Sequence, residues 1–200
     1  MPGDRGRVLP VWKISRIYDI PVKRVSDINQ PAVVKLLEDL KPDIIVSAYF
    51  NQIIKEPIIE LPRLGILNIH PGWLPAYRGA MAYFWVLKNG SETAGVSVHW
   101  IDKGTDTGEI VARRQIKIEK GMTQQKVLIL TAVTGSILLQ RIAKLILTGQ
   151  KPNGISVKDE QSQYYSVPGE KEFNEYFNQQ RFFRIRDVIS FLLRRKNKIQ

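Results

Sequence analysis

The stretch GILNIHPGWLPAYRG, residues 65–79, decides the fold, because it joins an apolar run to a loop rich in Pro and Gly. Residues 66–70 suit a strand that is covered on both faces, and Pro71 ends that strand. Residues 44–48 form another uninterrupted apolar run. Strands of this kind are typical of a largely parallel sheet covered by helices, so the sequence predicts an α/β domain.

Helical and extended patterns alternate on both sides of these two runs, without repeats or a Ser/Gly linker. Asn29 is a candidate helix cap, with Pro31 in the first turn. The segment around residues 8–19 is either a short helix or an ordered loop. From apolar spacing and turn residues we expect strands at 20–25, 44–48, 66–70, 94–101 and 109–118, an extended piece at 164–168, and helices at 32–40, 80–88, 123–148, 170–180 and 184–195.

The composition excludes several classes of protein. With 44% hydrophobic and 24% charged residues, the chain has enough apolar surface for one domain with a sizeable core. Cysteine is absent, which excludes disulfides, thiolate zinc sites and a cysteine nucleophile. With only two histidines, we expect no metal site. No run reaches the roughly 18 apolar residues of a membrane span, and the first residues lack an apolar signal core, so we expect a cytoplasmic protein without membrane association.

The net charge of +11 is concentrated at the two ends of the chain. Residues 1–24 carry +4 and residues 181–200 carry +6, whereas the 156 residues between them carry only +1. A basic end either steers an anionic partner, such as a nucleotide or RNA, or is a solvated tail that aids solubility. Charge alone does not separate these two interpretations.

Two polar side chains end the strand at 66–70. Because side chains alternate along a strand, Asn68 and His70 share one face, and their burial is costly without partners. An amide donor beside an imidazole suits a reaction that builds negative charge on a carbonyl oxygen. Asp102 and Asp106, on a Gly-bearing loop between later strands, are candidate carboxylates that would orient the imidazole or accept a proton.

Each of these features also has a structural explanation. A lone Asn or His at a strand end is commonly a hydrogen-bonded structural group. Asp and Gly in a strand connection commonly only form the turn. Neither segment taken alone supports a function.

Two runs in this order carry a family resemblance: N-x-H-P-x-x-L-P-x-Y-R-G over residues 68–79, and D-x-G-x-D-T-G over residues 102–108. Together they resemble the N-formyltransferases that use 10-formyltetrahydrofolate, including the glycinamide ribonucleotide, methionyl-tRNA and amino-sugar enzymes and a related hydrolase. The resemblance spans about residues 40–148. It implies a Rossmann-like α/β fold with a mostly parallel sheet flanked by helices, followed here by a helical C-terminal tail.

The resemblance implies that Asn68, His70 and Asp106 are catalytic, with Asp102 as the turn residue. A substrate amine would attack the formyl carbon, Asn68 and protonated His70 would stabilise the oxyanion, and Asp106 would hold His70 charged and help remove the amine proton. The acceptor would be an amino sugar on a nucleotide carrier or another small-molecule amine, with an aminoacylated RNA as the less favoured alternative.

The cofactor in such relatives is 10-formyltetrahydrofolate, and no metal is implied. The resemblance suggests that Ile53, Gly104 and Thr105 contact the folate. Arg78 would either bind a substrate phosphate or cap its loop through backbone carbonyls. His99 is interpreted as a structural residue.

The chain departs from the family at both ends. Family members open with a strand, a turn and a helix, so we expect either a fragment or a truncated homologue whose sheet lacks an inner strand. We expect residues 1–150 to be a catalytic domain that is partial at its N-terminus, and residues 151–200 to be a basic, mostly helical extension. The alternatives are a formyltetrahydrofolate hydrolase and a non-catalytic homologue that binds RNA through its basic ends.

Overall fold

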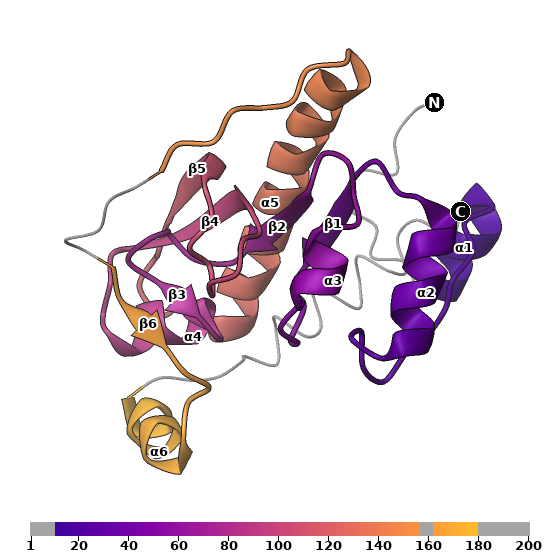
Figure 1. Cartoon of the computed structure of the whole chain (residues 1–200). Coiled ribbons are helices and arrows are strands. Elements are labelled where there is room, and N and C mark those ends of the chain that lie inside the picture. The colour runs from indigo at the N-terminus through magenta and orange to yellow at the C-terminus, as the bar shows by residue number, and fades with distance from the viewer. Residues whose placement is uncertain (1–10, 157–161, 180–200) are drawn as a thin grey trace, which may run out of the picture.

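The computed structural model describes residues 11–156 and 162–179, and Figure 1 shows their arrangement. The elements of this part of the chain are helices α1 (Val11–Tyr18), α2 (Pro31–Leu40), α3 (Glu56–Ile59), α4 (Ala82–Lys88), α5 (Gln124–Leu147) and α6 (Glu170–Gln179), and strands β1 (Ile45–Ala48), β2 (Ile66–His70), β3 (Arg78–Gly79), β4 (Thr93–Trp100), β5 (Ile110–Lys117) and β6 (Tyr164–Tyr165). The helix expected at 184–195 lies outside the described residues. The division of the chain after residue 150 stays a prediction.

The main sheet has the strand order β1-β2-β4-β5. Strands β1 and β2 are parallel, but β2 pairs antiparallel with β4, and β4 pairs antiparallel with β5. The expectation of a mostly parallel sheet is therefore wrong for the described strands, and the sheet is mixed. The direct turn between β4 and β5 accounts for one of the two antiparallel pairs, because such a short connection leaves no room for the crossover that parallel strands need.

The core lies between this sheet and the long helix α5, which crosses one face of it (Figure 1). Leu67 and Ile69 of β2 pack there with apolar residues of β4 and with Leu138 and Ile142 of α5. A side chain at Gly135 would collide with Ile69, so this glycine is what lets the helix approach the strand so closely. The architecture is α/β and Rossmann-like, as expected.

A smaller aromatic cluster joins the end of the described chain to the rest. Phe84 of α4 lies 5.0 Å, between ring centroids, from Tyr176 of α6. The short strands β3 and β6 pair in parallel, with Arg78 opposite Tyr164. Residues 162–179 therefore pack beside the loop that follows β2.

By length and composition alone, α5 is apolar enough to cross a membrane. This is weak evidence, because the core helix of a globular domain meets the same criterion. Only 22% of its most apolar window is buried, although Leu138 and Ile142 pack against the sheet.

Two expectations near the N-terminus are wrong. Residues 20–25 are described, and they form no strand. The N-cap of α2 is Gln30 rather than Asn29. The side chain of Asn29 instead reaches the loop after β1, where it donates to the Ile53 carbonyl (2.9 Å) and accepts from the Lys55 amide (2.9 Å).

Candidate active site at the end of strand β2

The polar face of β2 lies opposite two polar residues of β4. Alternation along β2 sends Leu67 and Ile69 into the core and places Asn68 and His70 on the other face. The antiparallel register sets Asn68 opposite His99 and His70 opposite Ser97. A polar surface thus forms within an otherwise apolar sheet.

Ser97 holds the Pro/Gly-rich loop that follows β2. Its hydroxyl accepts from the Leu74 amide (3.1 Å) and donates to the Gly72 carbonyl (2.8 Å). Arg113 of β5 adds a bond to the Leu74 carbonyl (2.7 Å). The loop is therefore fixed by β4 and β5 and brings the Tyr77 carbonyl within 2.6 Å of Nε2 of His70.

The loop between β4 and β5 presents Asp106. Asp102 forms the turn, as expected, because its carboxylate accepts from the Gly104 amide (3.1 Å) and the Thr107 hydroxyl (2.6 Å). A side chain at Gly108 would strike the Trp100 carbonyl, so the two arms of the loop run very close together. Asp106 has φ +52°, a left-handed conformation that is uncommon for a residue with a side chain and concentrates at functional sites.

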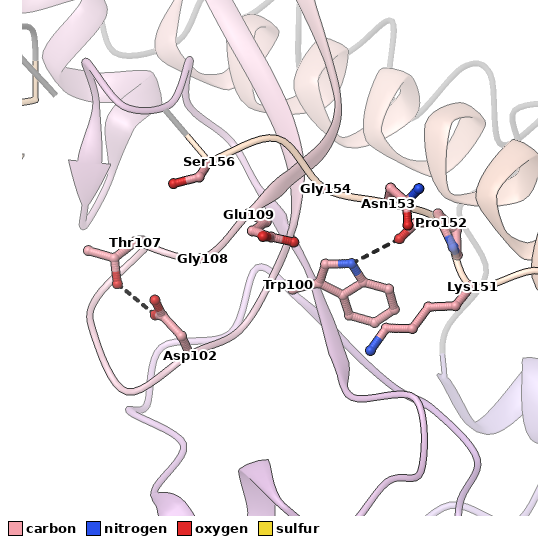
Figure 2. A pocket seen from close by; sticks show the side chains of 10 residues that line it. All are labelled: Trp100, Asp102, Thr107, Gly108, Glu109, Lys151, Pro152, Asn153, Gly154 and Ser156. Carbon is pink, nitrogen blue, oxygen red and sulfur yellow. Dashed lines mark hydrogen bonds between the residues drawn. The ribbon is translucent and has the colours of Figure 1, made fainter. Parts of the chain in front are cut away.

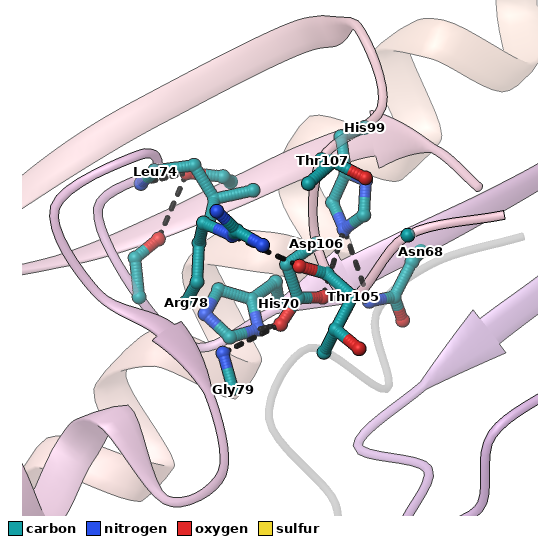
Figure 3. A network of polar contacts seen from close by, with 12 residues as sticks. Asn68, His70, Leu74, Arg78, Gly79, His99, Thr105, Asp106 and Thr107 are labelled. Atoms are coloured by element: carbon teal, nitrogen blue, oxygen red, sulfur yellow. Dashed lines mark hydrogen bonds and ion pairs between the residues drawn. The ribbon is translucent and has the colours of Figure 1, made fainter. Parts of the chain in front are cut away.

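Asp106 meets both histidines of the chain (Figure 3). Its Oδ2 lies 3.4 Å from Nδ1 of His70, and its Oδ1 lies 3.3 Å from Nε2 of His99. The Gly79 amide donates to Oδ2 (2.8 Å), and Nδ2 of Asn68 lies 3.4 Å from Oδ1. The three residues expected to converge from two distant segments of the chain do lie together.

Burial and the neighbouring charges determine the protonation of this cluster. Burial lowers the pKa of His70 below its ordinary value, and the Asp106 carboxylate acts in the opposite direction. Burial alone would raise the pKa of Asp106, but the hydrogen bond with His99, the charge of His70 and the Gly79 amide lower it to about 2. The carboxylate of Asp106 therefore stays ionised, whereas burial disfavours the charged form of His70 that the family resemblance implied.

Arg78 contacts protein atoms on both sides. Its Nε donates to the Thr105 carbonyl (2.9 Å), and its Nη1 donates to the Ser162 hydroxyl (2.9 Å). The guanidinium thereby ties the Asp106 loop to the segment before β6, which is the capping alternative of the two roles considered for it. Thr105 and Gly104, both expected to contact folate, lie on the loop next to Asp106, but their contacts with a ligand stay a prediction.

Ile53 lies on the loop after β1 and is 73% exposed. Because β1 and β2 are adjacent and parallel, this loop leaves the same edge of the sheet as the loop after His70. An ion pair between Lys103 and Glu56 connects α3 to the Asp106 loop. The residues predicted to contact folate therefore lie on two loops, and the ion pair connects one of these loops to α3, the helix that follows the other loop. The role of Ile53 itself stays a prediction.

His99, which the sequence analysis interpreted as a structural residue, lies in the same cluster. It is 2% exposed, and its Nε2 lies 3.1 Å from Nδ2 of Asn68. Neither motif includes it, and only the antiparallel register places it opposite Asn68. A histidine in an apolar strand directly before the D-x-G-x-D loop was the available signal.

A pocket of about 380 Å³ is lined in part by the same loop (Figure 2). Trp100, Asp102, Thr107 and Glu109 line it together with residues of the 151–156 segment. None of Asn68, His70 and Asp106 contributes to its wall, so this pocket is separate from the polar cluster. Among residues 11–156 and 162–179, no group of three or more His, Asp or Glu side chains could hold a metal ion.

Comparisons with known proteins agree with this geometry. The sequence model described as "Formyl transferase" matches residues 20–142. The chain is 39% identical over 120 residues to a methionyl-tRNA formyltransferase of Syntrophus aciditrophicus, covering 58% of this chain and 38% of that protein. It is 37% identical over 155 residues to the bifunctional polymyxin resistance protein ArnA of Wigglesworthia glossinidia brevipalpis, covering 78% and 24%. The chain thus spans about half or less of these relatives.

Solved structures show the same fold. The formyltransferase PseJ of Anoxybacillus kamchatkensis, in complex with UDP-4,6-dideoxy-4-formamido-L-AltNAc and tetrahydrofolate, has a TM-score of 0.61 and 25% identity, and the match covers 78% of this chain and 77% of PseJ. The sugar 3N-formyl transferase WlaRD also has a TM-score of 0.61, at 22% identity, over 78% of this chain and 53% of that one. Because the sequence model covers more than half of its residues, the chain belongs to the formyl transferase family.

Proposed function

We propose that this chain carries the formyl-transfer site of an enzyme that moves a formyl group from 10-formyltetrahydrofolate to a primary amine. The observation that supports this most strongly is the meeting of Asn68, His70 and Asp106 within hydrogen-bonding reach, from two motifs far apart in the sequence. An amide and an imidazole beside a carboxylate suit the stabilisation of an oxyanion and the removal of a proton.

The proposed reaction proceeds in two steps. The amine nitrogen forms a bond to the formyl carbon, and the carbonyl electrons move to oxygen. The oxyanion then collapses, the bond from carbon to N10 of the folate breaks, and tetrahydrofolate leaves. The amine loses one proton and N10 gains one, so a group that accepts and returns a proton balances the reaction.

The residues take these roles in the following way. The His70–Asp106 pair accepts the amine proton, which stays on the imidazole because the pKa of Asp106 is about 2. Asn68 and His70 donate to the oxyanion. In the structure Nε2 of His70 faces the Tyr77 carbonyl at 2.6 Å, so the formyl oxygen must share or replace that contact. Hydrogen bonds at active sites commonly rearrange in this way when substrate binds.

The acceptor is proposed to be a small molecule with a primary amine, in the class of nucleotide-linked amino sugars. The complex of PseJ with a UDP-linked formamido sugar supports this class. The relatives that are methionyl-tRNA formyltransferases make an aminoacylated RNA the competing acceptor. The basic ends of the chain do not decide between them, because residues 1–10 and 180–200 lie outside the described part.

The test measures the products made from 10-formyltetrahydrofolate. Tetrahydrofolate formation is followed with methionyl-tRNA, with dTDP-3-aminofucose, and without an amine, while formate is measured in parallel. Release of tetrahydrofolate that depends on an amine, without formate, is expected. Formate release that is independent of any amine would identify a hydrolase. Salt-sensitive RNA binding with no turnover would identify a non-catalytic relative.

A further inference from the structure

The hydrogen bonding of His99 fixes its tautomer. Its Nδ1 lies 2.8 Å from the backbone carbonyl oxygen of Trp100. A carbonyl oxygen only accepts hydrogen bonds, so Nδ1 must carry a hydrogen in every protonation state. The other ring nitrogen, Nε2, is therefore the one position on this ring that gains or loses a proton.

Two neighbours make opposite demands on that nitrogen. Nδ2 of Asn68, at 3.1 Å, is a donor and needs a bare Nε2. Oδ1 of Asp106, at 3.3 Å, is an acceptor and needs a protonated Nε2. His99 is only 2% exposed, so solvent does not relieve the conflict. One proton on Nε2 thus decides which neighbour is satisfied.

The orientation of Asn68 follows from this choice. In the structure its Nδ2 makes both of its polar contacts inward, to His99 and to Asp106. While Nε2 is bare, the amide hydrogens are held there, and Oδ1 of Asn68 is turned away from them (Figure 3). Once Nε2 is protonated, it no longer accepts from Nδ2, and two donors face each other at 3.1 Å. Nδ2 then keeps only its longer contact with Oδ1 of Asp106, at 3.4 Å, so the amide is less firmly held and can turn its hydrogens elsewhere.

We propose that His99 is a positioning residue whose Nε2 proton selects which end of the Asn68 carboxamide faces the reacting atoms. A bare Nε2 leaves Oδ1 of Asn68 outward, where it suits the N–H groups of an incoming amine. A protonated Nε2 releases the amide hydrogens, which suits a carbonyl oxygen that becomes negative. The inference rests on the proposed function only in assuming that Asn68 contacts these reacting atoms.

The titratable neighbours of the ring are few. On the Asp106 loop it faces the carboxylate, and on β2 it faces His70, with ring centroids 6.4 Å apart. On β5 its register partner is the apolar Ile110. Arg78 is a permanent cation bound to the Thr105 carbonyl of the same loop. The behaviour of His99 should therefore follow the protonation of His70 and Asp106 more than any other group.

The first experiment determines the two tautomers by ¹⁵N-histidine NMR on the full chain without ligand. With only two histidines, both ring systems are resolved, and a His70→Gln spectrum assigns them. The Nδ1–H form is expected for His99. The Nε2–H form is expected for His70, because Nε2 faces the Tyr77 carbonyl. An Nε2–H tautomer at a neutral His99 would overturn the proposal.

The second experiment follows the side-chain amide of Asn68 through a pH titration, assigned by its loss in Asn68→Ala. Its two proton shifts should change together with Nε2 of His99. In His99→Gln, which keeps a hydrogen-bonding group without a titrating one, that linked change should disappear. Val98→Ala is the matched control, because it perturbs the opposite, core-facing side of the same strand. Amide shifts that ignore the state of His99, or that change equally in Val98→Ala, would refute the proposal.

Kinetics give a third test. His99→Gln should lower kcat for tetrahydrofolate release about tenfold, with the KM for 10-formyltetrahydrofolate within twofold of wild type, and should remove one limb of the pH profile. An unchanged profile in His99→Gln would contradict the proposal. Failure of the proposed function is distinguishable, because wild type would then lack turnover while the NMR results stand independently.

Discussion

The ends of β1 and β2 lie next to each other in the sheet, yet they are built differently. At the end of β2, His70 and His99 are almost fully buried and share one carboxylate with several fixed partners. At the end of β1, Ile53 is 73% exposed, and its loop is held by one hydrogen bond that Asn29 donates and one that it accepts. Buried contacts thus hold the polar side chains at the end of β2 in place, whereas the loop after β1 depends on a few contacts at the surface.

The largest effect on the rate of formyl transfer should come from substitutions in the buried cluster at the end of β2. Asp106→Asn and His70→Ala should each lower formyl transfer at least about a hundredfold, because they remove the proton acceptor or its partner. Tetrahydrofolate release measures the rate, and circular dichroism verifies that each variant is folded. Turnover like that of wild type in a folded variant would show that the cluster is structural.

The second prediction concerns acid stability, which the buried cluster should control. Because burial lowers the pKa of His70, the unfolded chain binds more protons below the ordinary value of 6.5, and stability should fall as the pH drops through that value. The lowered pKa of Asp106 adds stability that is present above 3.8 and is lost toward about 2, worth about 2 kcal/mol.

Urea unfolding at a series of pH values measures both contributions. His70→Gln should flatten the decrease that begins near pH 6.5, and Asp106→Asn should flatten the decrease below pH 4. If both variants followed the wild-type curve, the cluster would contribute nothing to the pH dependence of folding.

A smaller effect is expected from a substitution that affects the exposed loop after β1. Asn29→Ala removes both side-chain bonds to the loop after β1, so the KM for 10-formyltetrahydrofolate should rise several-fold while kcat stays nearly constant. Asn51→Ala, at an exposed position on the same loop, is the control. A fall in kcat with constant KM would instead connect this loop to the chemical step.

The smallest effect should follow Lys103→Ala. Its ion pair with Glu56 lies at the surface, where salt and water weaken such pairs. The KM for 10-formyltetrahydrofolate should change less than about twofold and should converge with wild type at high salt. A large change that persists at high salt would mean that Lys103 contacts the ligand directly.

The sequence predicted those elements whose signals are local. The apolar run that became β2 was placed at 66–70, as the structure has it, and α5 was expected within one residue at each end. The convergence of Asn68 and Asp106 was also expected, because two long motifs carried it. Local patterns suffice when burial and turn residues define an element without reference to distant segments.

What the sequence could not provide depends on pairing between strands. The antiparallel register of β2 and β4 brings His99 opposite Asn68, and no periodicity within either strand encodes it. The run at 20–25 has strand composition but gains no partner strand, so its propensity is overridden. Asn29 was expected to cap a helix, but its side chain satisfies backbone groups on another loop.

The bond from Arg78 to Ser162 has a practical consequence for work with this protein. A shortened version designed to stop at residue 150 would remove the hydroxyl that holds one arm of Arg78 and the Tyr165 ring stacked 5.2 Å from Tyr77. Tyr77 supplies the carbonyl next to Nε2 of His70. Removal of the residues after 150 would therefore weaken the contacts that position this carbonyl. Expression boundaries should therefore be placed beyond α6.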